Sequence, residues 1–235
     1  ADWRGAYDPA YNRDRFALKP IDYSDPSVPT PNKFGGSYYP NVFNTYLRTF
    51  INREIGRVVV IRFKPWKSVK TYNNARTFDS KGAEMRFWSI SLSESQATTR
   101  VMDGVFDEEF PINPDGYVTF VASSERERPK FATAECGVGW ANWKMRGDGV
   151  GNPNFGWLSI RNMLPEPGTP DNFFSLKRPG DERQVLGEHY PVLKYFKDAA
   201  AFDALGCGGA AKRDAMKGVP DKGSPGAIGW PYAAK

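Results

Sequence analysis

The strongest constraint on the fold is a stretch at residues 84–123, which contains two strand-like runs, Met85–Leu92 and Tyr117–Ala122. Large apolar side chains alternate with small polar ones in the first run, and this two-residue period is typical of a half-buried strand. The turn sequence NPDG at 113–116 precedes the second run, since proline presets φ and glycine accepts positive φ. We therefore expect one core between two sheets, shared by Trp88, Ile90, Leu92, Val118 and Phe120.

The composition favours a mainly β protein. The chain of 235 residues holds 19 Pro and 23 Gly, too many for a helical protein, because both interrupt helix interiors. Two further β-branched or aromatic runs, Arg57–Phe63 and Trp157–Leu164, are predicted strands. The segment 41–52 also carries a helical apolar stripe, but we expect a strand that forms a hairpin with 57–63.

One helix is predicted near the C-terminus, over residues 191–205. Pro191 suits a first helical turn, and Gly206 follows the last apolar residue. An apolar stripe at helical spacing consists of Val192, Tyr195, Phe196, Ala199 and Phe202. Segment 170–187 is expected to be irregular.

Both ends of the chain have the composition of extended arms, which divides it into an N-terminal arm at 1–40, a β-sandwich or jelly-roll-like body at 41–206 and a C-terminal arm at 207–235. Prolines and aromatics dominate the first arm, and glycines and prolines the second. Ordering so long a backbone costs about 1–2 kcal/mol per residue, so each arm needs a folded surface, either its own body or another chain. We expect neighbouring chains, with the anchors Trp3, Tyr7, Tyr11, Phe16, Trp230 and Tyr232.

Six short motifs carry a family resemblance. In order they are PNVFNTY at 40–46, GRVVVIR at 56–62, RFWSISL at 86–92, NPDGYV at 113–118, GWANW at 139–143 and LSIRNMLP at 158–165. Over residues 38–168 the chain resembles the paired exported bacterial domains of unknown function of the "twelve-fifty-four" and "twelve-fourteen" types. The resemblance implies a β-sandwich or jelly-roll body in a periplasmic or secreted protein, and it carries over no catalytic residue.

Cysteine usage and the chain start point towards export. Cys136 and Cys207 are the only cysteines, and in an exported protein we expect them to be bridged, stabilising the fold by roughly 4 kcal/mol. Two buried thiols are the alternative. The first residue, Ala1, fits a mature product after signal cleavage. No apolar run approaches the ~20 residues of a membrane span. The net charge of +5 is not gathered into a basic block, so no nucleic-acid partner is expected.

The sequence contains no established catalytic signature. Nucleophile elbows, HExxH helices, P-loops and GxGxxG turns are missing, and the single histidine, His189, is expected at the surface or as a helix cap. A carboxylate cluster could serve acid–base chemistry or bind calcium, although a solvated connection between strands is the simpler interpretation. Its members are Asp103, Asp107, Glu108 and Glu109.

Two weaker binding motifs remain. Oxygen-bearing residues alternate with glycines at Asp148, Asn152 and Asn154, a composition that suits a calcium loop or an ordinary exposed loop. Trp140 and Trp143 lie among glycines and are candidates for ligand contact, although tryptophans are more often core residues. No other cofactor is expected.

Two functions follow. The first is a non-catalytic exported accessory or structural subunit that docks through its arms onto a larger homo- or hetero-oligomeric assembly. The alternative is a periplasmic enzyme, or a protein that binds a small molecule or carbohydrate, with a cleft lined by aromatics and carboxylates.

Overall fold

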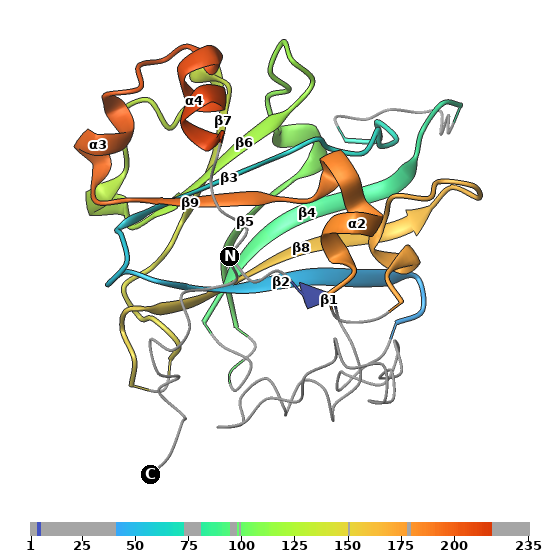
Figure 1. Ribbon diagram of the computed structural model, residues 1–235. Coiled ribbons are helices and arrows are strands. Elements are labelled where there is room, and N and C mark those ends of the chain that lie inside the picture. The colour runs from blue at the N-terminus through green and yellow to red at the C-terminus, as the bar shows by residue number, and fades with distance from the viewer. Residues whose placement is uncertain are drawn as a thin grey trace.

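Two β-sheets face each other in the computed structural model, which describes residues 4–5, 41–72, 81–94, 98, 100–149, 151–177 and 180–217. Figure 1 shows the sheets as two layers. The five-stranded sheet has the order β1 (Arg4–Gly5), β2 (Asn44–Asn52), β8 (Phe155–Pro165), β4 (Met85–Ser93) and β5 (Val101–Phe106). The four-stranded sheet has the order β7 (Val138–Asn142), β6 (Val118–Ser123), β3 (Val58–Phe63) and β9 (Val192–Phe196). Neighbouring strands are antiparallel, except that β6 and β7 are parallel. The fold is therefore mainly β, as predicted.

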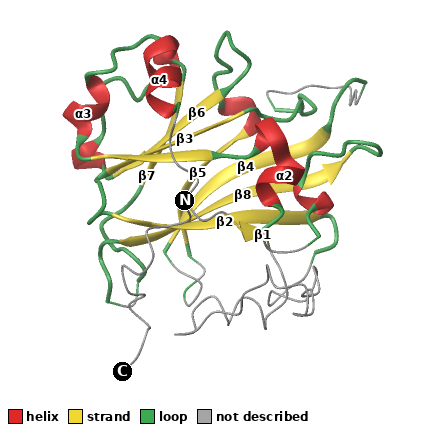
Figure 2. Ribbon diagram, in the orientation of Figure 1, coloured by secondary structure: helices red, strands yellow, loops and turns green. Residues whose placement is uncertain are grey.

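Helices are short and lie around the sheets. The α-helices described are α2 (Glu182–Leu186), α3 (Ala199–Asp203) and α4 (Gly209–Met216). The 3₁₀ turns are η1 (Asp107–Glu109), η2 (Glu125–Glu127), η3 (Ala134–Cys136), η4 (Phe173–Ser175) and η5 (Gly187–His189). Figure 2 shows α3 and α4 together at one end of the four-stranded sheet, with α2 at the other end of the molecule. None of these helices is long and apolar enough to cross a membrane.

The core lies between the two sheets, where the sequence places it. Trp88, Ile90, Leu92, Val118 and Phe120 belong to one cluster of buried side chains. The Trp88 indole meets Phe63 edge-on, with ring centroids 5.5 Å apart, and its Nε1 donates to the Trp66 carbonyl over 3.1 Å. That hydrogen bond satisfies the polar atom of an otherwise apolar side chain, so the tryptophan can be buried at little polar cost.

The predicted hairpin at 41–63 is wrong in its pairing. Both segments are strands, but β2 pairs with β1 and β8, whereas β3 pairs with β6 and β9. The turn between them therefore carries the chain from one sheet to the other. The alternation of buried and partly exposed residues along β2 also excludes the helical alternative for this segment.

The predicted helix at 191–205 is wrong over its first half. Residues 192–196 form β9, which pairs along β3, and only α3 is helical. Asp198 divides the two, since its carboxylate accepts from the Ala201 backbone N–H over 2.9 Å and caps α3. Apolar residues spaced three and four apart fit a strand followed by a helix as well as one helix.

Some elements lie where the sequence predicts none. β5 lies in the connection expected to be polar, β7 follows Cys136, and α2 falls in the segment 170–187 expected to be irregular. In the arms, β1 forms within 1–40 and α4 within 207–235. The proposed domain boundaries stay a prediction.

Candidate functional site

The register of the five-stranded sheet builds one continuous outer face. In β2, β8 and β4, every second residue points into the core, and the residues between them lie on the outer side of the sheet. The register places these outer residues opposite one another on neighbouring strands. Cross-strand rows are Asn44–Met163–Phe87, Tyr46–Arg161–Ser89, Arg48–Ser159–Ser91 and Phe50–Trp157–Ser93. Phe106 of β5 extends the second row, opposite Ser89. We call these positions the aromatic–arginine face.

Rings and guanidinium groups on this face contact one another. Phe50 and Trp157 stack with centroids 5.9 Å apart. The Arg48 guanidinium lies 4.8 Å from the Tyr46 ring and 4.9 Å from the Trp157 ring. Cation–π contacts of this kind hold the positive charge over flat apolar surface. The face is therefore an ordered aromatic surface with embedded cations.

The charge of the face has one sign. Two arginines occupy its rows, and these register positions hold no aspartate or glutamate. Trp157 is only 8% exposed, and its Nε1 has no hydrogen-bond acceptor among the described residues. Arg161 and Tyr46 are partly exposed on the face and suit a partner that brings carboxylate or carbonyl acceptors, whereas Arg48 and Phe50 already have further contacts within the chain.

The N-terminal segment meets the body at the edge of the same sheet. Gly5 of β1 pairs with Leu47 of β2, and the chain re-enters the described structure at Asn41, just before β2 begins. Part of segment 1–40, which is predicted to be an extended arm on neighbouring chains, therefore adds a strand to the chain's own body. The predicted anchors Trp3, Tyr7, Tyr11, Phe16, Trp230 and Tyr232 lie outside the described residues.

The two candidate ligand-binding tryptophans differ in environment. Trp143 is completely buried, beneath the Arg53 guanidinium at 4.0 Å from the ring, and therefore belongs to the core. Burial lowers the pKa of Arg53 to about 10. Trp140 is partly exposed, with Arg128 4.0 Å above its ring and its Nε1 donating to Ser123 Oγ over 3.0 Å. The structure does not bring these rings together into one platform with exposed faces.

The candidate calcium loop makes internal hydrogen bonds. The Asp148 carboxylate accepts from the backbone N–H of Asn152 over 2.9 Å and from its amide over 2.6 Å. Asn154 donates instead to Glu54, over 3.1 Å. Among the described residues no cluster of three or more His, Cys, Asp or Glu side chains could hold a metal ion. Calcium binding by these three residues stays a prediction.

The carboxylates at 103–109 serve the backbone. Asp103 accepts from Asn142 N over 2.7 Å, and Glu108 accepts from Thr71 N over 2.7 Å and Tyr72 N over 2.9 Å. Asp107 is buried, which raises the pKa of its carboxyl. These contacts join strands and loops, and do not converge on one point as an acid–base pair must.

His189 is buried, so the predicted surface position is wrong. Its ring stacks on Trp66 at 4.7 Å, and its Nδ1 lies 2.7 Å from the Lys64 carbonyl oxygen. Burial lowers the pKa of the imidazole, which favours the neutral form. The histidine is thereby held as a packing residue at the entrance to β9.

The predicted disulfide between Cys136 and Cys207 is present, with Cα atoms 4.7 Å apart. The aromatic–arginine face, in contrast, was missed from sequence. A signal existed in Tyr46, Arg48 and Phe50, which alternate with the core residues of β2. Because alternation alone does not say which neighbours lie alongside, the face becomes visible only with the β2–β8–β4 register.

Comparisons with known proteins place the chain in no family. No family model and no curated protein matches it. Two solved structures show limited similarity. An uncharacterised protein of Burkholderia cenocepacia has 16% identity and a TM-score of 0.37, covering 60% of this chain and 30% of that chain. The VPA0106 protein of Vibrio parahaemolyticus has 14% identity and a TM-score of 0.34, covering 70% and 33%. The chain thus matches about a third of each, and the resemblance to the paired exported domains stays a prediction.

Proposed function

We propose that this chain is a non-catalytic, exported accessory subunit, which docks through its arms and the adjoining aromatic–arginine face onto a larger protein assembly. The observation that carries the proposal is the composition of that face, together with the β1–β2 pairing at its edge. The partner surface that fits is a protein surface with exposed carboxylates.

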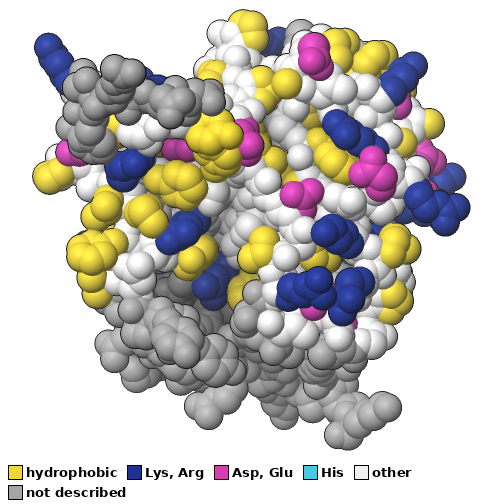
Figure 3. All heavy atoms as spheres, turned by 180° about the vertical axis from the view of Figure 1, so that it is seen from behind, with side chains coloured by type: hydrophobic (Ala, Val, Ile, Leu, Met, Phe, Trp, Pro, Cys, Tyr) yellow, Lys and Arg dark blue, Asp and Glu magenta, His cyan; other side chains and the backbone are white. Residues whose placement is uncertain are grey.

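The side chains of the face match those of protein interfaces. Interface cores are enriched in Tyr, Trp, Phe, Met and Arg, and depleted in Lys, Glu and Asp. The four rows contain each of the enriched types and no Lys, Glu or Asp, whereas serine, which interface cores also deplete, occupies four of their twelve positions. A sheet face that served only as solvated surface would instead carry polar and charged side chains of both signs. Figure 3 shows such a surface on another side of the molecule, where basic, acidic and hydrophobic side chains are mixed.

The position of the arm supports the same proposal. Arg4 and Gly5, near the N-terminal end of the arm, pair with β2, whose Tyr46, Arg48 and Phe50 lie on the face. A partner that binds the arm is thereby held close to the face. Two linked contacts raise the effective concentration of each other, so a modest face and a modest arm together give stable docking.

The chemistry of the polar groups supports a non-catalytic role. The carboxylates and the histidine that the sequence offers for catalysis form internal hydrogen bonds or pack in the core. Export is supported by the disulfide, because such bridges persist in oxidising compartments.

A double substitution on the face tests the proposal. The partner is first identified by mass spectrometry as a chain present in stoichiometric amount with the full-length protein after native purification. Tyr46→Ser/Phe50→Ser should then weaken its binding about thirtyfold or more, since even one aromatic hot spot contributes about 2 kcal/mol or more.

The matched control is Ile112→Ser, which removes an exposed apolar side chain outside the four rows. Its affinity should stay within about twofold of the unmodified chain, and circular dichroism should show all three proteins folded. Unchanged binding by the double variant would remove the face from the docking surface. A chain that purifies as a monodisperse monomer and turns over a substrate would contradict the proposed function as a whole.

A further inference from the structure

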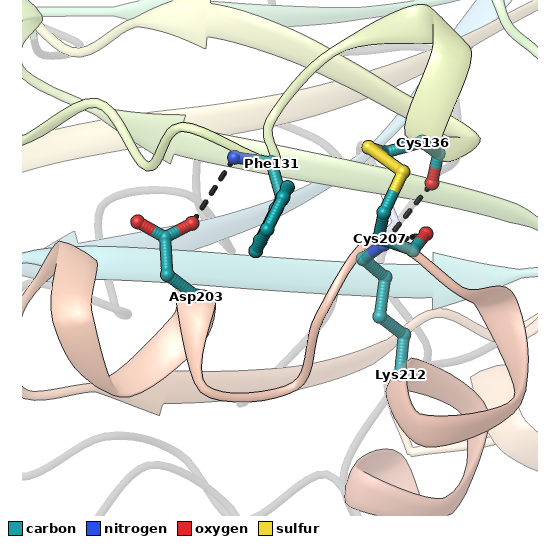
Figure 4. Close-up of a disulfide and its surroundings, with 5 residues drawn as sticks. All are labelled: Phe131, Cys136, Asp203, Cys207 and Lys212. Atoms are coloured by element: carbon teal, nitrogen blue, oxygen red, sulfur yellow. Dashed lines mark hydrogen bonds between the residues drawn. A yellow bond between two sulfur atoms is a disulfide. The ribbon is translucent and has the colours of Figure 1, made fainter.

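The disulfide joins two segments that lie far apart in the sequence. Cys136 ends η3, two residues before β7 begins, and Cys207 lies in the connection between α3 and α4, at a sequence separation of 71. Figure 4 shows the Lys212 side chain reaching from α4 towards this bridge. The bridge, the lysine and α4 therefore form one local unit on the outer side of the four-stranded sheet.

Lys212 is buried without a counterion. Its side chain is only 1% exposed, and its Nζ donates to the Cys207 carbonyl over 2.7 Å and to the Cys136 carbonyl over 3.1 Å. No carboxylate in the described part of the chain forms an ion pair with it. Burial lowers the pKa of the Lys212 ammonium. The negative charge of Asp203 raises this pKa, but by a smaller amount and without a direct ion pair. Among the described residues, besides the two carbonyls, the ammonium has only a long contact with the Phe202 ring, 5.9 Å from Nζ to the ring centroid. A desolvated charge is costly without hydrogen-bond acceptors, so it depends on both carbonyls being in place.

α3 has an anchorage that does not depend on the bridge. Phe202 is completely buried and meets Phe196 edge-on, with centroids 5.7 Å apart. The Asp203 carboxylate accepts from the backbone N–H of Phe131 over 3.0 Å (Figure 4). It also accepts from the backbone N–H of Lys130 over 3.1 Å. These contacts tie α3 to β9 and to the loop before η3, whether or not the cysteines are joined.

α4 has weaker anchorage. It spans eight residues, too few to be stable alone in water. Its other contacts are Met216, which is 7% exposed, and the Ala215 carbonyl, which accepts from Lys194 Nζ over 2.8 Å. The docking of α4 thus rests on a small apolar contact and on the Lys212 site.

We propose that α4 docks onto the body only after the Cys136–Cys207 bridge has formed, and that the Lys212 ammonium enforces this condition. The closed bridge holds the two carbonyls side by side as acceptors for Nζ. Without it the Cys207 carbonyl moves away, the ammonium loses an acceptor, and hydration of the charge draws α4 off the sheet. In the chain-entropy model, a bridge across a loop of this length raises the equilibrium constant for folding on the order of a thousandfold. This gain is large enough to offset the cost of keeping the Lys212 ammonium buried.

The bridge forms by thiol–disulfide exchange with a disulfide-bearing protein oxidant. The two thiols lose two protons and two electrons as the S–S bond forms, and the oxidant disulfide takes them up and leaves as a dithiol. In a reducing compartment the bridge is open and α4 stays undocked. After transfer to an oxidising compartment the bridge forms and α4 docks onto the body. The rest of the C-terminal arm follows α4, so the docking of α4 would also set where that arm leaves the body. This last link rests on the proposed function, whereas the redox condition does not.

Hydrogen exchange of the full-length chain tests the condition without any partner. The oxidised protein is compared with protein reduced by dithiothreitol, reduction being verified by mass. On reduction, α4 amides should exchange at nearly the rate of an unstructured peptide, while α3, β4 and β8 stay protected and lose no more than the roughly thousandfold that loss of the bridge removes from global stability. If dithiothreitol leaves the bridge intact, Cys136→Ala/Cys207→Ala replaces it.

Two neutral variants isolate the charge. Lys212→Gln keeps N–H donors and Lys212→Met keeps the length, and at least one of them should retain α4 protection within about tenfold after reduction. Lys217→Met, which removes an exposed lysine just after α4, should behave as the unmodified chain does. The proposal is overturned if reduced α4 stays protected with Lys212 present. It is also overturned if both neutral variants lose as much protection as the unmodified chain, if neither docks α4 when oxidised, or if β4 and β8 become as unprotected as α4 on reduction.

Discussion

Trp88→Ala should lower the free energy of unfolding by about 3–5 kcal/mol, the usual range for emptying a large aromatic site. The indole is 1% exposed and packs between two aromatic rings. Its ring centroid lies 5.5 Å from that of Phe63 and 4.9 Å from that of Phe110. Its loss opens a cavity in the shared core and leaves the Trp66 carbonyl without the indole N–H. Urea unfolding followed by circular dichroism measures the change.

The neighbouring residue gives the control for this prediction. Phe87 is partly exposed and lies opposite Met163 on the outer side of the sheet. Phe87→Ala removes a ring of similar chemistry without emptying the core, so its loss of stability should be clearly smaller. A loss below about 1 kcal/mol for Trp88→Ala would show that the two sheets do not pack around this residue.

Cys136→Ser/Cys207→Ser should lower the free energy of unfolding by about 4 kcal/mol relative to the oxidised chain. The bridge links positions separated by 71 residues, a loop that includes β7, β8, β9 and α3. Without the bridge, the unfolded chain gains conformational freedom, because these elements are no longer constrained by a closed loop. Both residues are replaced so that no free thiol remains.

Urea unfolding of the double variant and of the oxidised and reduced unmodified chain gives the comparison. The reduced chain should agree with the double variant to within about 1 kcal/mol, because both lack the same covalent link. Equal stability of oxidised chain and double variant would mean that the bridge contributes no net stabilisation, and would weaken the argument for export.

The strands that carry the core were predictable because their chemistry is local. In Met85–Leu92 and Tyr117–Ala122, alternation and residue type agree, and the structure places β4 and β6 there. Strand pairing was not predictable in the same way. The short turn after β2 suggested a hairpin, but β2 pairs with β8, more than a hundred residues away. Long-range pairing depends on which apolar faces meet, and a single sequence does not contain that information locally.

Residues 191–205 show a second limit on predicting secondary structure from the sequence alone. Val192, Tyr195 and Phe196 suit a strand through their side-chain type and a helix through their spacing. Tertiary pairing with β3 decides for the strand up to Phe196, and the cap at Asp198 starts α3. Local propensity is a weak prior that such pairing overrides.

Some features of the candidate site were likewise predictable from the sequence, and others were not. The disulfide was predictable, since two cysteines in an exported chain have one pairing. The buried state of Trp143 and His189 was not, because it depends on Arg53 and Trp66, which lie far away in sequence. The aromatic–arginine face likewise arises from three strands that only the fold brings together.

The central claim, docking through the N-terminal arm and its adjoining face, is tested most directly by the native mass of the full-length chain purified from its own compartment. Light scattering after size exclusion compares it with a variant in which Trp3, Tyr7, Tyr11 and Phe16 are replaced by serine. Arg4 and Gly5 are kept, so that β1 can still pair with β2. The unmodified chain should elute as a complex with a partner in fixed ratio, and the variant as a folded monomer near 26.3 kDa. A variant that still elutes in the same complex, or an unmodified chain that is itself a monomer, would contradict the account.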